Sequence, residues 1–195
     1  MRVYYNEFMI PKTIILLLSG GLDSVTLLYQ LKLEGHSIHC LLFDYKQRHK
    51  QELEWAKHHA RRCGVLFTTM DLPQLGGLTE QSWIVPNRNA IFLSVAVNVA
   101  CQAKADAVVI GCNADDASYF PDCRQDFISA MNAAVKSAGY SVEICAPFMR
   151  KHKWEIGQLA QEMGVVPNEI WTCYHGGSKP CGKCPACEKL AGAIK

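Results

Sequence analysis

The stretch Thr13-Ile14-Ile15-Leu16-Leu17-Leu18-Ser19-Gly20-Gly21-Leu22-Asp23-Ser24 joins a run of apolar residues to a polar turn that contains two glycines. The apolar run, residues 13–18, predicts a strand that is buried on both faces. Apolar residues then recur at helical spacing, which predicts a helix over 23–34 that ends at Gly35. The stretch therefore predicts the strand–turn–helix unit from which parallel α/β sheets are built.

The rest of the chain repeats this alternation of strand and helix. Apolar runs predict four further strands, over 38–43, 65–70, 107–111 and 143–146. Helical spacing predicts four further helices, over 51–63, 88–103, 122–138 and 153–163. We therefore expect an α/β fold, with a parallel sheet covered by helices on both faces. The loops after the strands should meet at one edge of this sheet and bind the ligand. These loops are residues 19–24, 44–50, 71–89, 112–124 and 147–153.

Length and composition limit the class of protein. The 195 residues fit one α/β domain, predicted over 12–165, with a small C-terminal segment over 166–195. The 49% hydrophobic and 19% charged residues argue against a disordered chain. A net charge of +2 is too small to indicate direct binding of nucleic acid. No apolar run reaches the roughly 18 residues that span a bilayer, and the start lacks the layout of a signal peptide. We therefore expect a cytoplasmic protein.

The turn from Ser19 to Ser24 has the features of an anion-binding loop. Gly20 and Gly21 let backbone N–H groups approach an anion, because no Cβ stands in the way. The helix that follows adds unpaired N–H groups and a favourable dipole. Asp23 is placed to orient a Mg²⁺ ion held by phosphates, although an aspartate near a helix start also serves as a cap. The loop is not a Walker A motif, because the Gly-Lys-Ser/Thr ending is missing.

Charged side chains also follow the second predicted strand. The segment Asp44-Tyr45-Lys46-Gln47-Arg48-His49 combines an acid, an amide, a ring and three potential cations. Such a set suits a nucleotide and its metal, but charged runs are equally often solvated turns. Asp44 and His49 are the candidates for a general base, since histidine titrates near neutral pH.

Two basic residues open predicted helices. Arg88 follows Val85-Pro86-Asn87, at a helix start where the dipole disfavours a cation. Its placement there indicates an anionic partner such as a phosphate or a carboxylate. Lys153 opens the last long helix. A surface position is the alternative for both residues.

The segment Tyr119-Phe120-Pro121-Asp122-Cys123-Arg124 places two aromatic rings beside an acid and an arginine. The rings can stack on a purine, the Asp122 carboxylate can accept hydrogen bonds from a guanine-like edge, and Arg124 can pair with a carboxylate. The alternative is that Asp122 caps the next helix and Arg124 lies in solvent.

Four of the ten cysteines cluster near the C-terminus. Cys173 lies eight residues before Cys181-x-x-Cys184-x-x-Cys187. Four thiolates at this spacing match tetrahedral Zn²⁺, and a complete set of four indicates a structural site. Unligated thiols or redox pairs are the alternative for the cluster. The six scattered cysteines are expected to be reduced thiols.

These segments resemble those of two nested enzyme families. Residues 19–24 resemble the S-G-G-x-D-S signature of the PP-loop ATP-pyrophosphatases, which have a Rossmann-like (adenine nucleotide alpha hydrolase-like) fold and cleave ATP between its α and β phosphates. Four further segments, 44–49, 85–89, 116–124 and 173–187, are similar to those of the 7-cyano-7-deazaguanine synthases within that superfamily. The chain departs from the family pattern at Lys46 and Tyr119, which replace glycines, at Phe120, which replaces a tyrosine, and at Leu190, where an arginine is usual. Residues 1–11 are an extension, unless Met9 is the start.

The resemblance implies a reaction and a role for each motif. These synthases convert 7-carboxy-7-deazaguanine and ammonia to 7-cyano-7-deazaguanine through an adenylated acid and an adenylated amide, in queuosine or other deazapurine biosynthesis. The resemblance implies that residues 19–24 bind ATP and pyrophosphate, and that a homodimer forms with Mg²⁺ bound beside ATP and Zn²⁺ on the four cysteines. The implied catalytic residues are Asp23, Arg88 and Lys153. The implied substrate-binding residues are Gln47, Arg48, His49, Asp122 and Arg124.

Three alternatives stay open on the sequence. The departures at Tyr119 and Phe120 allow a related enzyme that stops at the amide, acts on another carboxylate or joins a deazapurine to a protein. A tRNA sulfurtransferase of the same superfamily would need a reactive cysteine pair that is free of metal. A non-enzymatic zinc module would leave five loop motifs without a purpose.

Overall fold

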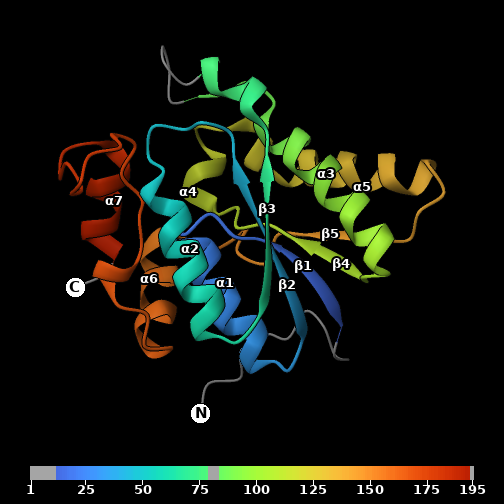
Figure 1. Cartoon of the computed structure of the whole chain (residues 1–195), viewed down its shortest axis with the longest axis horizontal. Helices are drawn as coiled ribbons and strands as arrows, with labels where there is room; N and C mark the ends of the chain where they lie inside the picture. Colours follow the sequence, from blue (N-terminus) through green and yellow to red (C-terminus); the bar gives the residue numbers. More distant parts are fainter. Residues whose placement is uncertain (1–11, 79–83, 194–195) are drawn as a thin grey trace.

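Five parallel strands form one sheet in the order β3-β2-β1-β4-β5 (Figure 1). The strands are β1 (Thr13–Leu17), β2 (Ser37–Asp44), β3 (Leu66–Asp71), β4 (Ala107–Val109) and β5 (Glu143–Cys145). The computed structural model describes residues 12–78 and 84–193, so the choice between Met1 and Met9 as the start lies outside the described residues. All four neighbouring strand pairs are parallel, which confirms the predicted sheet.

The central strand β1 contributes to two separate cores. Ile14 and Leu16 pack in the core on one face of the sheet, and Ile15 and Leu17 pack in the core on the other, because successive side chains of a strand point to opposite faces. This double burial explains the continuous apolar run in the sequence. Since β1 lies between β2 and β4, the strand order reverses there, and such a switch point leaves a crevice at the carboxyl ends of the strands.

Helices cover both faces of the sheet (Figure 1). The face of Ile14 is covered by α1 (Leu22–Leu33), α2 (Gln51–Arg62) and α6 (Lys153–Glu162). The opposite face is covered by α3 (Arg88–Ala103) and α5 (Gln125–Ser137). Each of these helices is an element that the sequence predicts, with small shifts at the ends. The predicted arrangement of helices on both faces is therefore confirmed.

Several short elements depart from the predictions. The predicted loop 112–121 contains α4 (Ala114–Ala117), which is too short to show a periodic pattern, and the turn-rich tail contains α7 (Pro185–Ala193). The helix expected from residue 122 begins only at Gln125, because Arg124 has an extended backbone with φ −94° and ψ 157°. Short 3₁₀ turns complete the described chain, η1 (Pro73–Leu78), η2 (Pro121–Cys123) and η3 (Pro167–Glu169).

The C-terminal segment packs directly on the α/β domain. A Cβ at Gly157 of α6 would overlap the carbonyl group of Ala193 in α7, so these two helices approach each other as closely as backbone allows. Nearer the sheet, the backbone N–H of Trp171 donates to the carbonyl oxygen of Gly20 at 2.9 Å. The tail is thereby fixed to the loop that follows β1.

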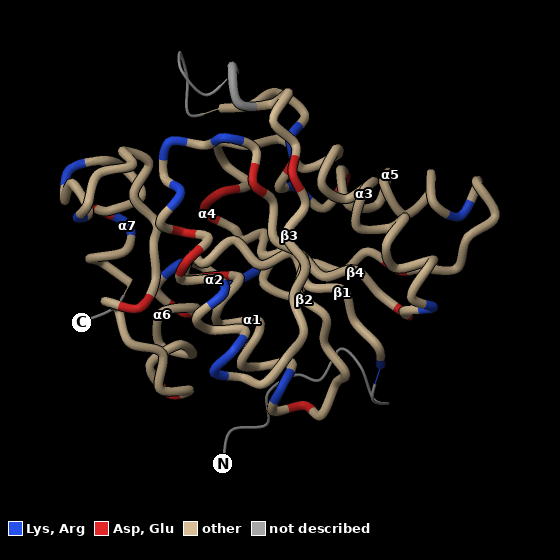
Figure 2. The backbone as a smooth tube through the Cα atoms, viewed as in Figure 1, with Lys and Arg blue, Asp and Glu red and all other residues tan. Residues whose placement is uncertain are grey.

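Charge and hydropathy give two further results for the described residues. Lysines and arginines are interspersed with aspartates and glutamates along the backbone (Figure 2). None of the helices described here has both the length and the apolar character that a membrane span needs.

Candidate functional site

A cavity of about 620 Å³ opens beside the carboxyl ends of β1, β2 and β4. Its volume lies in the range of sites that bind small molecules and cofactors. Among the residues predicted to form the site, those that line it are Ser19, Gly21, Leu22, Asp23, Ser24, His49, Arg88, Asp122 and Lys153. The fold thus brings together residues from all five predicted loops at the predicted edge of the sheet.

The loop after β1 is held by its own serines. The Ser24 hydroxyl accepts a hydrogen bond from the Ser19 backbone N–H at 3.2 Å and donates one to the Gly21 carbonyl oxygen at 3.2 Å. The Ser19 hydroxyl lies 3.1 Å from that of Ser24. Gly21 is the N-cap of α1, and no side chain caps this helix. Asp23 therefore does not act as the cap, and the first N–H groups of α1 face a cavity that can hold an anion.

Gly20 is glycine for a reason of packing. Its φ is +89°, and a Cβ there would overlap the carbonyl oxygen of Glu52 and press on the backbone of Ala56 in α2. The loop can thus lie against the first turn of α2 only with glycine at this position. Of the two glycines in this loop, Gly21, with φ −84°, is the one that lines the cavity. A contact between Gly20 and an anion stays a prediction.

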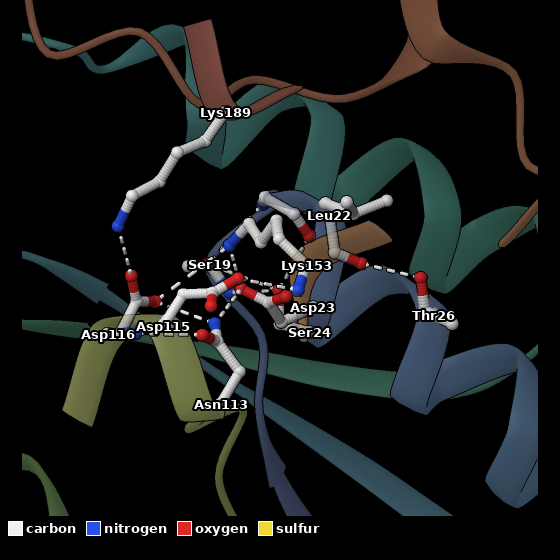
Figure 3. Close-up of polar contacts among 11 residues, drawn as sticks. Ser19, Leu22, Asp23, Ser24, Thr26, Asn113, Asp115, Asp116, Lys153 and Lys189 are labelled. Atoms are coloured by element: carbon white, nitrogen blue, oxygen red, sulfur yellow. Dashed lines mark hydrogen bonds and ion pairs between the residues drawn. The ribbon is translucent and has the colours of Figure 1, made fainter. Parts of the chain in front are cut away.

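One side of the cavity is lined by Asp23, Asp116 and Lys153, and the buried Asn113 bonds to the two carboxylates from behind. We call this hydrogen-bonded cluster of four residues the polar wall (Figure 3). The Lys153 ammonium lies 2.5 Å from Asp23 Oδ2 and 3.8 Å from Asp116 Oδ2. The Asn113 amide, which is fully buried, donates to Asp23 at 3.3 Å and to Asp116 at 2.7 Å. Residues far apart in sequence therefore converge on one polar surface.

Two neighbouring carboxylates keep Lys153 charged, whereas one oxygen of Asp23 has no hydrogen-bond partner among the described residues. Burial by itself would lower the pKa of Lys153, but the Asp23 and Asp116 carboxylates outweigh it and raise that pKa above its usual value. Burial also raises the pKa of Asp23 against the pull of Lys153. Asp23 Oδ1 is buried and, among the described residues, has no hydrogen-bond partner. A buried oxygen without a partner is costly, and it is a suitable ligand for a hard cation such as Mg²⁺.

A second side of the cavity, the aromatic wall, consists of Tyr45, Arg88 and Phe92. Arg88 donates to the Tyr45 hydroxyl at 3.2 Å, and its guanidinium lies 5.8 Å from the centre of the Phe92 ring. Within the described parts of the chain, no carboxylate lies within 4.0 Å of this guanidinium. Arg88 is therefore held by rings and keeps its charge available for an anion.

Beside the aromatic wall lies a carboxylate that the sequence analysis did not identify. Glu52 Oε1 accepts from the Gln47 amide at 2.9 Å, and Glu52 Oε2 lies 3.4 Å from His49 Nε2. Burial raises the pKa of Glu52 to about 7, and burial together with the nearby Arg88 lowers the pKa of His49 to about 4. The sequence shows Glu52 only as an acid in the first turn of a helix, because its neighbours come from other segments.

Three predicted substrate-binding residues do not line the cavity. Gln47 is 1% exposed, and its amide bonds to Tyr45 N, to the Phe43 carbonyl oxygen and to Glu52. Arg48 is exposed. Arg124 is also exposed, and its Nε donates to the Ala117 carbonyl oxygen at 2.9 Å. In this arrangement Gln47 and Arg124 stabilise the loops that carry His49 and Asp122.

The structure distinguishes between the alternatives that the sequence left open for Asp122 and Asp44. Asp122 lies in η2, and the N-cap of α5 is Arg124, so the alternative that Asp122 caps α5 is wrong. Asp44 accepts from the Lys46 N–H at 2.9 Å and pairs with Lys50 at 3.4 Å. Asp44 does not line the cavity, whereas His49 does, so the geometry favours His49 of the two candidate bases.

The four clustered cysteines converge as a metal site requires. The sulfur atoms of Cys173, Cys181, Cys184 and Cys187 all lie within 4.8 Å of one another. A tetrahedral Zn²⁺ with Zn–S bonds of about 2.3 Å would separate its ligands by about 3.8 Å. Backbone N–H groups of His175 and Cys181 point at the Cys173 sulfur at 3.4 and 3.3 Å, as is suitable for a thiolate. The described cluster therefore fits a metal ion with four sulfur ligands.

The helix after this cluster reaches the cavity. Lys189 of α7 lies 3.3 Å from Asp116 Oδ1 (Figure 3). Its ammonium also lies 4.9 Å from the centre of the Tyr119 ring. Lys189 and Tyr119 both line the cavity. Tyr119 stands where the related synthases have glycine, and Lys189 is next to Leu190, where they have arginine. One departure from the family pattern, Tyr119, thus contacts the neighbour in sequence of another, which the sequence alone did not predict.

Comparisons with known proteins agree on one family. The chain matches the family described as "Queuosine biosynthesis protein QueC" over residues 13–195. It is 40% identical over 203 residues to a 7-cyano-7-deazaguanine synthase of Trichodesmium erythraeum, covering 89% of this chain and 91% of that protein. A 7-cyano-7-deazaguanine synthase of Hahella chejuensis is 36% identical, with 92% and 87% covered.

Among solved structures, the fold resembles the U34-tRNA thiolase NcsA from Methanococcus maripaludis with its [4Fe-4S] cluster. The TM-score is 0.61, and the match covers 96% of this chain and 67% of the thiolase. At 15% identity, this likeness concerns the fold alone, and it confirms the predicted Rossmann-like architecture.

Proposed function

Because the chain belongs to the QueC family of queuosine biosynthesis proteins, we propose that it is an ATP-dependent ligase that makes 7-cyano-7-deazaguanine from 7-carboxy-7-deazaguanine and ammonia. The family match covers residues 13–195, and the predicted family and enzyme class are thereby confirmed. The specific substrate is proposed from the names of the relatives and from the chemistry of the cavity.

The polar wall supports a role in nucleotide cleavage. The backbone N–H groups at the start of α1 would bind the pyrophosphate that leaves when AMP is transferred. Lys153, held in its charged form by Asp23 and Asp116, would stabilise negative charge on the phosphates. Asp23 Oδ1, and Asp116 beside it, would hold a Mg²⁺ ion, which would neutralise charge on the phosphate oxygens.

The reaction would proceed in two adenylations. In the first, the carboxylate oxygen of the substrate attacks the α-phosphorus of ATP, and pyrophosphate leaves. Ammonia then displaces AMP from the acyl adenylate and gives the amide. In the second adenylation, the amide oxygen attacks the α-phosphorus of another ATP, and pyrophosphate leaves. Loss of AMP and of the two N–H protons then gives the nitrile. The protein would contribute mainly positioning and electrostatic stabilisation.

The aromatic wall supports binding of a planar acid. Tyr45 and Phe92 offer ring surfaces for stacking, and Arg88 offers a guanidinium without a carboxylate partner among the described residues. Asp122 lines the same cavity and would accept hydrogen bonds from the guanine-like edge. His49 would lie beside the substrate, whereas Gln47, Arg48 and Arg124 would act through the loops rather than by contact.

The remaining proposals concern the metal and the assembly. We propose that Cys173, Cys181, Cys184 and Cys187 hold a structural Zn²⁺, since four sulfur ligands fill a tetrahedral shell. Elemental analysis of the purified protein tests this, and iron with sulfide in place of zinc would contradict it. The family resemblance supports a homodimer and a cytoplasmic location. We also propose that the chain divides into an α/β domain, residues 12–165, and a C-terminal metal-binding segment, residues 166–195. Direct binding of nucleic acid is not expected.

The observation that carries the proposal is the ion pair of Asp23 and Lys153 beside a loop whose N–H groups face the cavity. We test the proposal by incubating the protein with 7-carboxy-7-deazaguanine, ATP, Mg²⁺ and ammonium, and following the deazapurine by mass spectrometry. The nitrile is the expected product. An unchanged substrate would contradict the proposal, and an amide or a protein adduct would favour the related enzymes with altered substrate.

Sulfur transfer to tRNA is the alternative with the most specific observation. Cys112 and Cys123 lie outside the metal cluster, and both line the cavity. However, a hydrogen bond with Cys123 and burial raise the pKa of the Cys112 thiol well above its usual value, so this thiol is a poor nucleophile. Serine at both positions should leave nitrile formation in place, and would abolish activity if sulfur transfer were the function.

A further inference from the structure

Glu52 is the one carboxylate at the aromatic side of the cavity for which the reaction outlined above gives no role. Its side chain is 13% exposed, and the only basic side chain within 4.0 Å of its carboxylate among the described residues is His49. The residue lines the cavity, so its carboxylate is buried in the protein but accessible to a bound ligand. Burial of an acid costs stability, so an acid retained at the edge of a cavity is a candidate for a functional role.

The position of Glu52 is fixed relative to the loop after β1. The Glu52 carbonyl group occupies the space that a Cβ at Gly20 would need, so the first turn of α2 touches this loop directly. The carboxylate oxygens are oriented by the Gln47 amide at 2.9 Å and by His49 at 3.4 Å. Glu52 thus borders the cavity close to the place where an acyl adenylate would form.

The proposed reaction needs a proton acceptor that the polar wall does not supply. In neutral solution ammonia is mostly ammonium, which has no lone pair for attack on a carbonyl carbon. The attacking nitrogen must also lose a proton before a neutral amide forms. Asp23 and Asp116 are paired with Lys153 and Lys189, so they are poorly suited to this task.

We propose that Glu52 is the general base that accepts the proton from the ammonia nucleophile in the amide-forming step, an inference that rests on the proposed function. The nitrogen lone pair forms the C–N bond, and the C–O bond to AMP breaks, with its electron pair leaving on AMP. One proton moves from the nitrogen to a Glu52 oxygen. The acyl adenylate, ammonia and the Glu52 carboxylate thus give the amide, AMP and the Glu52 carboxylic acid.

The groups around Glu52 suit this role. His49 faces it from the loop before α2, Gln47 donates to it, and Tyr45 and the Arg88 guanidinium face it from β2's end and from α3. Burial, outweighing Gln47 and Arg88, raises the pKa of Glu52 to about 7, near the value at which a base is most effective in neutral solution. Since the carboxylate is the active form, amide formation should rise as the pH increases through about 7.

The test uses two nucleophiles with the Glu52→Gln variant of the whole protein. Hydroxylamine is mostly unprotonated at neutral pH and captures acyl adenylates as hydroxamates, so it needs no base from the protein. The variant should keep substrate-dependent pyrophosphate release in a single turnover and keep hydroxamate formation. With ammonium, its amide formation should fall by about 10²–10⁴-fold, the usual contribution of a general base. The rise in rate through about pH 7 that remains after division by the concentration of unprotonated ammonia should also disappear.

Control variants distinguish a failure of the Glu52 proposal from a failure of the proposed function. Glu54→Gln changes an exposed acid on the same helix and should behave as the unmodified protein. Glu52→Asp, which keeps a carboxylate, should recover part of the ammonium reaction. An unchanged ammonium rate in Glu52→Gln would overturn the proposal, and so would an equal loss with both nucleophiles. Failure of the unmodified protein to release pyrophosphate would instead defeat the proposed function itself.

Discussion

The polar wall and the aromatic wall line the same cavity, but they are built in different ways. The polar wall consists of side chains that follow the ends of β1 and β4 or open α6, and each bonds to another member. The aromatic wall consists of the Tyr45 and Phe92 rings around Arg88. Beside it lies Glu52, whose side-chain partners among the described residues are Gln47 and His49. The difference indicates that the sheet fixes the position of the polar wall, which suits phosphate chemistry. The aromatic wall depends on the identity of its side chains, and it suits selection of the substrate.

The largest expected effect comes from removing Lys153, the cation of the polar wall that also lines the cavity. Lys153→Met should reduce substrate-dependent pyrophosphate release by about 10²–10³-fold, the usual loss of one preorganised electrostatic contact. The matched control is Lys57→Met, which changes a surface lysine paired with Glu54 at 2.8 Å. Pyrophosphate release is measured by a coupled assay at saturating ATP. An equal effect of both variants would contradict the role of the polar wall.

The support beneath the polar wall is tested by stability. Gly20→Ala should lower the free energy of unfolding by about 1–3 kcal/mol, because the added Cβ overlaps the α2 backbone. Gly35→Ala is the control: Gly35 also has a positive φ, of +83°, but open space around it, so it reports backbone strain alone. Urea unfolding measures both. If the two variants lose the same stability, the close approach of the loop to α2 is not what requires glycine.

The sequence predicted the polar wall better than the aromatic wall for a physical reason. Loops after parallel strands must meet at one edge, so residues 19–24 and Lys153 could be placed from the pattern alone. Their specific pairing could not, since Asp23 and Lys153 are brought together only by packing of α1 and α6. Glu52 was missed because burial and the contact with Gln47 change its chemistry, and neither is visible in a helical pattern. Lys189 was missed because α7 follows a turn-rich segment.

The aromatic wall is tested by a conservative change. Arg88→Lys keeps the charge but loses the planar group that rests on Phe92 and bonds to Tyr45. KM for the carboxylate substrate should rise about tenfold, which corresponds to the roughly 1.4 kcal/mol of one such contact, while kcat changes little. Steady-state kinetics at saturating ATP measure this. A fall in kcat with unchanged KM would instead place Arg88 with the phosphates, as the family resemblance implied.

The smallest expected effect concerns the contact between Lys189 and Tyr119, the residue that replaces a glycine of the family pattern. Lys189→Met removes a cation that lies over the Tyr119 ring and pairs with Asp116. Because an exposed contact of this kind contributes about 0.5–1 kcal/mol, KM for the substrate should change only a few-fold. Tyr119→Gly should give a similar change, and the double variant should add little to either. Additive losses in the double variant would show that the two residues act separately.

The central claim is that the loop beginning at Ser19 binds the pyrophosphate released when AMP is transferred. The most direct measurement follows ATP labelled at the α-phosphorus through a single turnover with 7-carboxy-7-deazaguanine. The account predicts that the label appears in AMP and in an adenylated intermediate, and that Asp23→Asn and Lys153→Met suppress both. Formation of labelled ADP with release of phosphate would contradict it.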